Sequence, residues 1–234
     1  MLKVEKLKKF YKTKLNSIHA LNGIDFSLQK GDHLAVIGSN GSGKTTLIKL
    51  LTQLTHPTSG RILIDDKPLS DNDKNKFGLM LGNSIVYHRL TVRQNLEYFA
   101  AIYNVENANE KISHHLAEFG LTERQHDLVE HLSEGMKSKV AFIRAIIHEP
   151  EILILDEPTN GVDPISTDIL LWHIKKYPTV IFSSHNLYEV VDVANKVLII
   201  NQGEQAFFGD IKDVKAGSQS SQAVREELLK MYKK

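Results

Sequence analysis

The chain has 234 residues, of which 41% are hydrophobic, and its 29 Lys and Arg against 28 Asp and Glu give a formal net charge of +1. This composition can supply the core of one large domain, or of a domain with an inserted subdomain, and the neutral balance gives no reason to expect nucleic-acid binding. Cysteine is absent, which excludes disulfides, thiolate catalysis and cysteine-ligated metals. The sequence has no apolar run of about 18 residues and no apolar stretch at its start, so we expect a soluble, cytoplasmic globular protein.

Strand patterns come first along the chain. Polar and apolar side chains alternate in the N-terminal part, most clearly at residues 24–28, which predicts half-buried antiparallel strands. A turn at Gly31 and Asp32 precedes the apolar run 34–37, which predicts a buried strand. The spacing of apolar residues over 44–51 is typical of a helix.

The middle of the chain, from about residue 90 to residue 148, has a helical pattern. Thr91 with Gln94, and Thr122 with Gln125, have the spacing of a capping box, in which two side chains satisfy free backbone N–H groups at a helix start. We therefore expect a helical subdomain, at about residues 84–148, inserted into the strand pattern.

Alternation at residues 61–66 and apolar runs at 151–155, 179–182 and 196–200 predict further strands. Helical segments lie between the last three runs, which is typical of a parallel sheet. The sequence thus predicts an α/β fold with a mainly parallel core sheet, an antiparallel N-terminal β subdomain and the helical insertion.

A glycine-rich segment follows the buried strand at 34–37 and matches the phosphate-loop motif G-x-x-x-x-G-K-S/T between a predicted strand and a predicted helix. Its glycines let backbone N–H groups surround phosphate oxygens, and the helix start adds the positive end of its dipole. Lys44 would place its charge at the β- and γ-phosphates, and the Thr45 hydroxyl can ligate Mg²⁺. An accidental match in a glycine-rich turn is the alternative. The predicted phosphate-binding residues are Gly38, Ser39, Asn40, Gly41, Ser42, Gly43, Lys44 and Thr45.

Two acids end the apolar run at 151–155. Asp156 is the predicted Mg²⁺ residue, and Glu157 the predicted general base for a water that attacks the γ-phosphate. A strand that ends in solvated acids is common, so the prediction depends on the phosphate loop elsewhere in the same chain. Together the two motifs predict hydrolysis of a nucleoside triphosphate.

Residues 1–210 resemble the ATP-binding subunit of an ABC transporter, because several motifs occur in that family's order. The resemblance implies the ABC type of P-loop NTPase fold and adds Thr46 to the phosphate loop. The motifs are the phosphate loop at 38–46, a signature segment at 132–136, the acidic strand end at 155–159, the loop at 161–164 and the histidine segment at 183–185.

The resemblance implies that two such domains pair head to tail and hold ATP between the phosphate loop of one chain and the signature segment of the other. Ser133 and Gly135 would then contact the γ-phosphate in the opposite site, and Asp163 would lie in the loop that communicates across the dimer. A helix that begins at Ser133 would face the phosphate with its positive dipole end. The alternative for Ser133 is an ordinary N-cap.

His185 would be the family's switch histidine at the γ-phosphate, and Tyr11 occupies the place of the aromatic residue that stacks on adenine. For Tyr11 the alternative is a surface or core tyrosine, and for His185 a buried or solvated histidine. The place of His185 after an apolar run and two serines favours the γ-phosphate role.

The sequence departs from the family pattern in two places. A glutamine usually follows the strand near residues 77–81, whereas here Gly82 takes that place and Asn83 follows it. Either Asn83 substitutes, or water completes the metal shell. The signature segment reads Ser133-Glu134-Gly135-Met136, which resembles bacterial exporters of drugs, antibiotics, sodium or polysaccharides.

We therefore expect an ATPase that uses ATP and Mg²⁺ as the motor subunit for a separate membrane permease, an exporter. It would form a homodimer, or a heterodimer with a second ABC ATPase, and it would be peripheral on the inner face of the cell membrane because the permease docks on the helical insertion. No nucleic-acid partner is expected. The alternative is a soluble ABC ATPase with a role in translation, repair or cluster assembly.

The expected organisation is an ABC ATPase domain at residues 1–214 and a helical C-terminal tail at 215–234. The tail contacts the permease, anionic lipid or the second subunit, or else it forms a solvated amphipathic helix.

Overall fold

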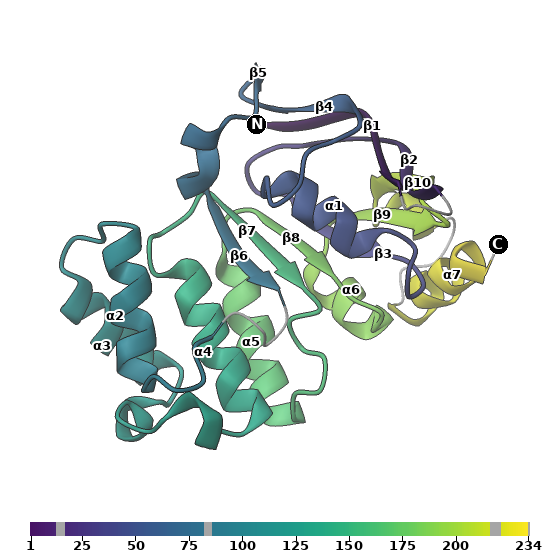
Figure 1. The fold of residues 1–234 in the computed structure, drawn as a ribbon. Helices are drawn as coiled ribbons and strands as arrows, with labels where there is room; N and C mark the ends of the chain where they lie inside the picture. The colour runs from purple at the N-terminus through teal and green to yellow at the C-terminus, as the bar shows by residue number, and fades with distance from the viewer. Residues whose placement is uncertain (13–16, 82–85, 216–220, 234) are drawn as a thin grey trace. The chain divides into compact units, whose positions relative to one another are not determined.

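The computed structural model describes residues 1–12, 17–81, 86–215 and 221–233 (Figure 1). The chain divides into two compact units, each described here by itself. The first unit contains residues 1–74 and 178–234, and the second contains residues 75–177.

The first unit contains an antiparallel sheet with the strand order β2-β1-β4-β5. Apolar side chains on alternate positions of its strands, such as Leu2, Val4 and Leu7, are buried, and the polar side chains between them are more exposed. The register of β1 shifts twice between Val4 and Lys8, where the strand bulges. The strands are β1 (Leu2–Lys12), β2 (Ser17–Leu28), β4 (Ser59–Ile64) and β5 (Lys67–Pro68).

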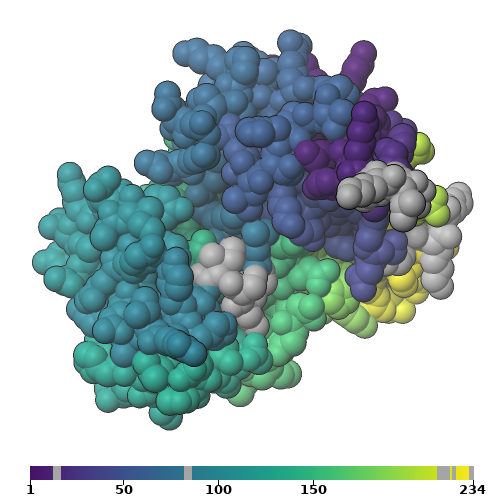
Figure 2. Space-filling model, in the orientation of Figure 1, coloured from purple at the N-terminus to yellow at the C-terminus, as the bar shows by residue number. Residues whose placement is uncertain are grey.

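The same unit contains a second group of strands, in which β3 pairs in parallel with both β8 and β9, and β10 is antiparallel to β9. Strands β3, β8 and β9 are almost wholly buried, as their continuous apolar runs require. Figure 2 shows the surface of this unit, with the N-terminal strands in purple and the C-terminal helix in yellow. Its elements are β3 (His33–Ile37), β8 (Val180–Ser183), β9 (Lys196–Asn201), β10 (Glu204–Asp210), α1 (Lys44–Leu51), α6 (Leu187–Val193), α7 (Ser221–Lys233) and the short 3₁₀ helix η4 (Asp213–Lys215).

The second unit is mainly helical and contains one parallel pair of strands, β6 and β7. Its core includes Phe119 and Phe142, whose rings lie 5.6 Å apart between centroids. The 3₁₀ helix η1 (Asp71–Lys76) leads into it from the first unit. The elements are β6 (Phe77–Leu81), β7 (Ile152–Asp156), α2 (Val92–Ile102), α3 (Ala108–Glu118), α4 (Glu134–Ile146), α5 (Pro164–Lys176) and the 3₁₀ helices η2 (Thr122–Arg124) and η3 (Val129–His131).

The two predicted capping boxes have different outcomes. The box at α2 is confirmed, because the Thr91 hydroxyl accepts from the Gln94 N–H and the Gln94 side chain accepts from the Thr91 N–H. The box at Thr122 is wrong: Leu121 precedes the 3₁₀ turn, and no side chain caps it. A turn of three residues does not leave the row of free N–H groups that a capping box satisfies.

The predicted α/β fold, with parallel pairing in the core and an antiparallel N-terminal sheet, is confirmed. In the part of the chain that the structure describes, no helix is both long enough and apolar enough to span a bilayer.

Candidate nucleotide-binding site

The predicted phosphate loop joins the end of β3 at Ile37 to the start of α1 at Lys44. Gly43, the residue before α1, has φ +115°, and a Cβ there would lie 2.5 Å from the carbonyl oxygen of Ala20. A Cβ on Gly38 would lie 2.4 Å from the carbonyl oxygen of Ile200. Both positions therefore need glycine, and the loop is held close against the strands of its own unit.

Lys44 is buried, with 6% of its surface exposed, and its ammonium group points back along the loop. Its Nζ atom donates to the carbonyl oxygens of Gly38 at 2.8 Å and Ser39 at 3.2 Å. The first turn of α1 contains no acid, and Gly43 has no side chain to cap it. The backbone N–H groups and positive dipole end at the start of α1, with the Lys44 charge beside them, make this loop suitable for anionic phosphate groups.

The predicted Mg²⁺ ligands are oxygen donors, which this ion prefers. Thr45 lies exposed in the first turn of α1, and Asp156 is the half-buried last residue of β7. The described residues contain no cluster of three or more His, Cys, Asp or Glu that could hold a metal. Mg²⁺ is usually held by one or two protein groups together with phosphate oxygens and water, so the roles of Thr45 and Asp156 stay predictions.

His185 follows β8, at the edge of the parallel strands that also carries the phosphate loop. The parallel register pairs Val36 with Ser183, so β3 and β8 end together. The backbone N–H of Ser184 also donates to the Val36 carbonyl at 3.4 Å. The structure therefore brings the exposed His185 and the phosphate loop to one edge. Glu189 bonds the residues on both sides of His185. The sequence motifs did not predict a role for it, although an acid four residues after this histidine was a visible signal.

Tyr11 lies near the end of β1, where its side chain is 37% exposed. The Lys9 ammonium lies 5.0 Å from the centroid of its ring. A partly exposed ring can stack on a base, so the predicted adenine contact of Tyr11 stays a prediction.

Glu157, the predicted general base, immediately follows β7 in the second unit. Its φ of +48° is uncommon for a residue with a side chain, and such strained conformations are concentrated at functional sites. The Asn160 side-chain amide donates to the Glu157 carboxylate at 3.1 Å, and the Asn160 backbone N–H donates to the Glu157 carbonyl at 3.2 Å. The turn thus fixes both the backbone and the carboxylate of this residue.

Ser133 is the N-cap of α4, where its hydroxyl accepts from the Met136 N–H at 3.3 Å. Asp163 is the N-cap of α5, and its carboxylate accepts from the Ser166 N–H at 2.9 Å. The backbone and side-chain hydrogen bonds from Ser166 lower the pKa of Asp163 below its ordinary value.

The structure brings Gly135 and Asp163 together within the second unit. A Cβ on the buried Gly135 would lie 2.3 Å from Oδ2 of Asp163 and 2.6 Å from Oγ of Ser166. Close packing of two helix starts is therefore one reason for glycine at this position. Gly82 and Asn83 lie outside the described residues, and the nucleotide contacts predicted for the second unit stay predictions.

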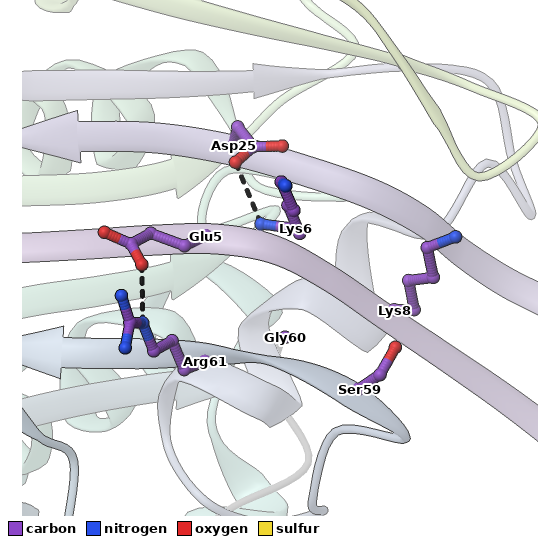
Figure 3. Close-up of a pocket in the computed structure, with 7 residues that line it drawn as sticks. All are labelled: Glu5, Lys6, Lys8, Asp25, Ser59, Gly60 and Arg61. Atoms are coloured by element: carbon purple, nitrogen blue, oxygen red, sulfur yellow. Dashed lines mark hydrogen bonds and ion pairs between the residues drawn. The ribbon is translucent and has the colours of Figure 1, made fainter.

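A groove of about 760 Å³ lies on the antiparallel sheet and contains none of the predicted site residues (Figure 3). Arg61 donates to the Glu5 carboxylate across it, and the Asp25 carboxylate accepts from the Lys6 N–H. Its lining residues are Glu5, Lys6, Lys8, Asp25, Ser59, Gly60 and Arg61.

A buried strand, a loop closed by obligatory glycines and a helix that begins at a buried lysine define the class of P-loop nucleotide-binding proteins. The family model described as "ABC transporter" matches residues 21–160. The chain belongs to the ABC transporter family, and it is one of the family's ATP-binding proteins, which hydrolyse ATP with Mg²⁺.

Relatives and a solved structure agree with this assignment. The linearmycin resistance ATP-binding protein LnrL of Bacillus subtilis is 34% identical over 92% of this chain and 70% of that protein. The nitrate import ATP-binding protein NrtD of Synechococcus elongatus is 32% identical over 83% of this chain and 74% of that protein. A solved structure described as the ATP-binding subunit of an ABC transporter is similar with a TM-score of 0.85 and 26% identity, over 99% of both chains.

Proposed function

We propose that this chain is the ATP-hydrolysing motor of an exporter, and that it pairs around ATP with a second copy or a close relative while a separate permease provides the pathway. The main structural support for ATP hydrolysis is the phosphate loop at residues 38–46. Its buried Lys44 and the uncapped start of α1 converge on one short glycine-rich segment.

In the proposed reaction, different groups of this chain bind the phosphates and activate the attacking water. Lys44 and the loop N–H groups hold the β- and γ-phosphates, and Glu157 orients and deprotonates the attacking water. Mg²⁺, held by Thr45 and Asp156, would neutralise phosphate charge. His185, at the phosphate-loop edge of β8, would donate to the γ-phosphate.

The second subunit would complete the site through the start of α4. Ser133 is exposed and caps this helix, whose positive dipole end and first N–H groups would face the γ-phosphate of the partner's ATP. Asp163 is exposed and holds the start of α5 against Gly135. A movement of the loop that contains Asp163 would therefore displace the signature segment at residues 132–136, because Asp163 and Gly135 are in direct contact.

The permease would dock on the helical insertion at about residues 84–148. Three apolar or aromatic side chains there are unusually exposed: Tyr87 at 48%, Tyr98 at 45% and Ile102 at 54%. The Tyr87 and Tyr98 rings meet edge to face, with centroids 5.1 Å apart, and Phe99 packs against both. Arg144 lies over the Phe99 ring at 4.4 Å and anchors this cluster. An exposed aromatic surface of this kind suits a helix from a permease.

Export is supported by the resistance protein among the relatives and by the Glu134-Gly135-Met136 sequence of the signature segment. The nitrate import protein among the relatives is 32% identical, so sequence identity at this level does not by itself distinguish exporters from importers. We propose export, with the chain peripheral on the inner face of the cell membrane through its permease, and an ATPase domain at 1–214 followed by a tail at 215–234.

The motor is tested with Glu157→Gln. We expect this variant to bind ATP like the parent, to hydrolyse it at least about 100-fold more slowly because the general base is lost, and to accumulate as an ATP-bound dimer in size-exclusion chromatography. Parental turnover would show that Glu157 is not the base.

The transport role is tested by purifying the native complex from membranes. A co-purifying multi-span permease supports the proposal, whereas ribosomes or soluble partners alone would reject it. Tyr98→Ala should weaken permease co-purification and leave ATP affinity unchanged. Trp172→Ala, which removes a 52% exposed aromatic side chain from α5 outside the Tyr87–Tyr98–Ile102 surface, is the matched control. Equal retention of the permease by both variants would contradict docking at this surface.

A further inference from the structure

A buried carboxylate follows the predicted switch histidine. Glu189, in the first turn of α6, is only 7% exposed. Burying a carboxylate is costly unless hydrogen bonds compensate for lost hydration. Here the Ser184 hydroxyl donates to Oε2 at 2.7 Å, and the Asn186 side-chain amide donates to Oε1 at 3.1 Å. The two donors are the residues immediately before and after His185.

Further hydrogen bonds extend this network. The Asn186 backbone N–H donates to the Ser184 hydroxyl at 3.0 Å. The Asn186 side-chain oxygen accepts from the Tyr188 N–H at 3.1 Å and thereby caps α6. Hydrogen bonds to a carboxylate are among the stronger ones in proteins. The backbone on both sides of His185 is therefore tied to the Glu189 side chain.

The network is also fixed to the strand that leads into the phosphate loop. Ser183 is fully buried and pairs with Val36 in the parallel register. Ser184 is 3% exposed, and its N–H donates to the Val36 carbonyl. The imidazole of His185, by contrast, belongs to an exposed residue. The rigid backbone fixes the position of the His185 Cα atom, and the direction in which its side chain leaves the chain, relative to the loop at the end of β3.

We infer that Glu189 is a positioning residue for His185, because its carboxylate holds Ser184 and Asn186 and so aims the imidazole between them at the phosphate-loop edge. The inference rests on the proposed role of His185 at the γ-phosphate. Glu189 does not need to touch the nucleotide, since it acts through the backbone of its neighbours.

The test uses the full chain in four variants: Glu189→Ala, Glu189→Gln, His185→Ala and the Glu189→Ala/His185→Ala double variant. Alanine removes both acceptors of the network. Glutamine has nearly the same shape, and its amide can accept from Asn186 and donate to the Ser184 oxygen, so it should restore most of the activity. Rates are measured in single-turnover assays with enzyme in excess, which detect slow hydrolysis, and ATP affinity is measured by calorimetry as a check on folding.

We expect Glu189→Ala to lower the hydrolysis rate by about 10- to 100-fold, the effect of misplacing a reacting group by about 1 Å, with ATP affinity unchanged. In the His185→Ala background the same substitution should have no further effect, because the group it positions is gone. Asn195→Ala is the matched control. It removes a side chain that bonds the His33 N–H at 2.9 Å and the Gly31 carbonyl at 3.2 Å, at the opposite end of β3, and should leave the rate unchanged.

The variants distinguish a failure of the role proposed for His185 from a failure of the positioning role of Glu189. If His185→Ala hydrolyses ATP at the parental rate, the role of His185 is wrong, and the inference falls with it. If His185→Ala is impaired but Glu189→Ala is parental, or lowers the rate by the same factor in both backgrounds, then the positioning role alone is overturned.

Discussion

Gly135→Ala sets two opposing effects against each other at the start of α4. Alanine is the better helix former, by about 0.8–1 kcal/mol in a helix interior. The added Cβ, however, would lie 2.3 Å from the Asp163 carboxylate and 2.6 Å from the Ser166 hydroxyl, where a normal contact needs about 3.5 Å. Asp163 would have to move by about 1 Å, and it would then lose its cap bond with the Ser166 N–H.

We expect the steric clash to outweigh the higher helix propensity of alanine. Overpacking of this kind costs about 1–3 kcal/mol, and the lost cap bond of Asp163 costs about 1 kcal/mol more, so the two together exceed the gain in helix propensity. We therefore expect Gly135→Ala to lower the free energy of unfolding by about 1–3 kcal/mol, measured by urea denaturation without nucleotide. A contact with the partner's ATP does not enter this measurement, so the result reports the packing role alone.

Asp163→Ala provides the matched background, because it removes the atom that the new Cβ would meet first. In that background Gly135→Ala should cost less, although not nothing, since the Ser166 hydroxyl remains 2.6 Å away. Parental stability of Gly135→Ala, or an equal loss of stability in both backgrounds, would show that the contact with Asp163 is not what requires glycine at position 135.

Two further predictions concern the phosphate loop and pH. Lys44→Ala should abolish detectable ATP binding in calorimetry, because it removes a buried cation that points along the loop; unchanged affinity would overturn the phosphate-loop assignment. Burial lowers the pKa of His115, His148 and His173 below the ordinary value of 6.5, so the unfolded chain binds more protons than the folded chain near and below that pH. The three neutral histidines therefore contribute fully to the free energy of unfolding above about pH 6.5. That contribution is lost as the pH falls toward their lower pKa values in the folded state, so the free energy of unfolding should decrease between about pH 7.5 and pH 5.5. His148→Gln should flatten that decrease, and an equal pH dependence in this variant would contradict the argument for His148.

Strands β3, β7, β8 and β9 of the parallel pairs were predictable, because burial on both faces produces continuous apolar runs. Such apolar runs occur at residues 34–37, 151–155 and 196–200, which lie in or next to β3, β7 and β9. The capping box of α2 was predictable for a similar reason, since Thr91 and Gln94 interact within one helical turn. The same local pattern failed at Thr122, where the backbone forms only a single 3₁₀ turn, and nothing in the four residues themselves reveals the length of the helix that follows.

The predicted site shows the same division between local and distant interactions. Lys44 and the glycines around it form a continuous segment, so their roles could be inferred from spacing alone. The contact between Gly135 and Asp163 joins residues 28 positions apart, and only the packing of α4 against α5 creates it. The Glu189 network lies within six residues, yet its importance depends on burial, because an exposed carboxylate at this position would be hydrated and would hold neither neighbour firmly. A residue that acts by position rather than by contact with the substrate is therefore the kind that motif matching misses, and the burial of its polar group is the observation that reveals it.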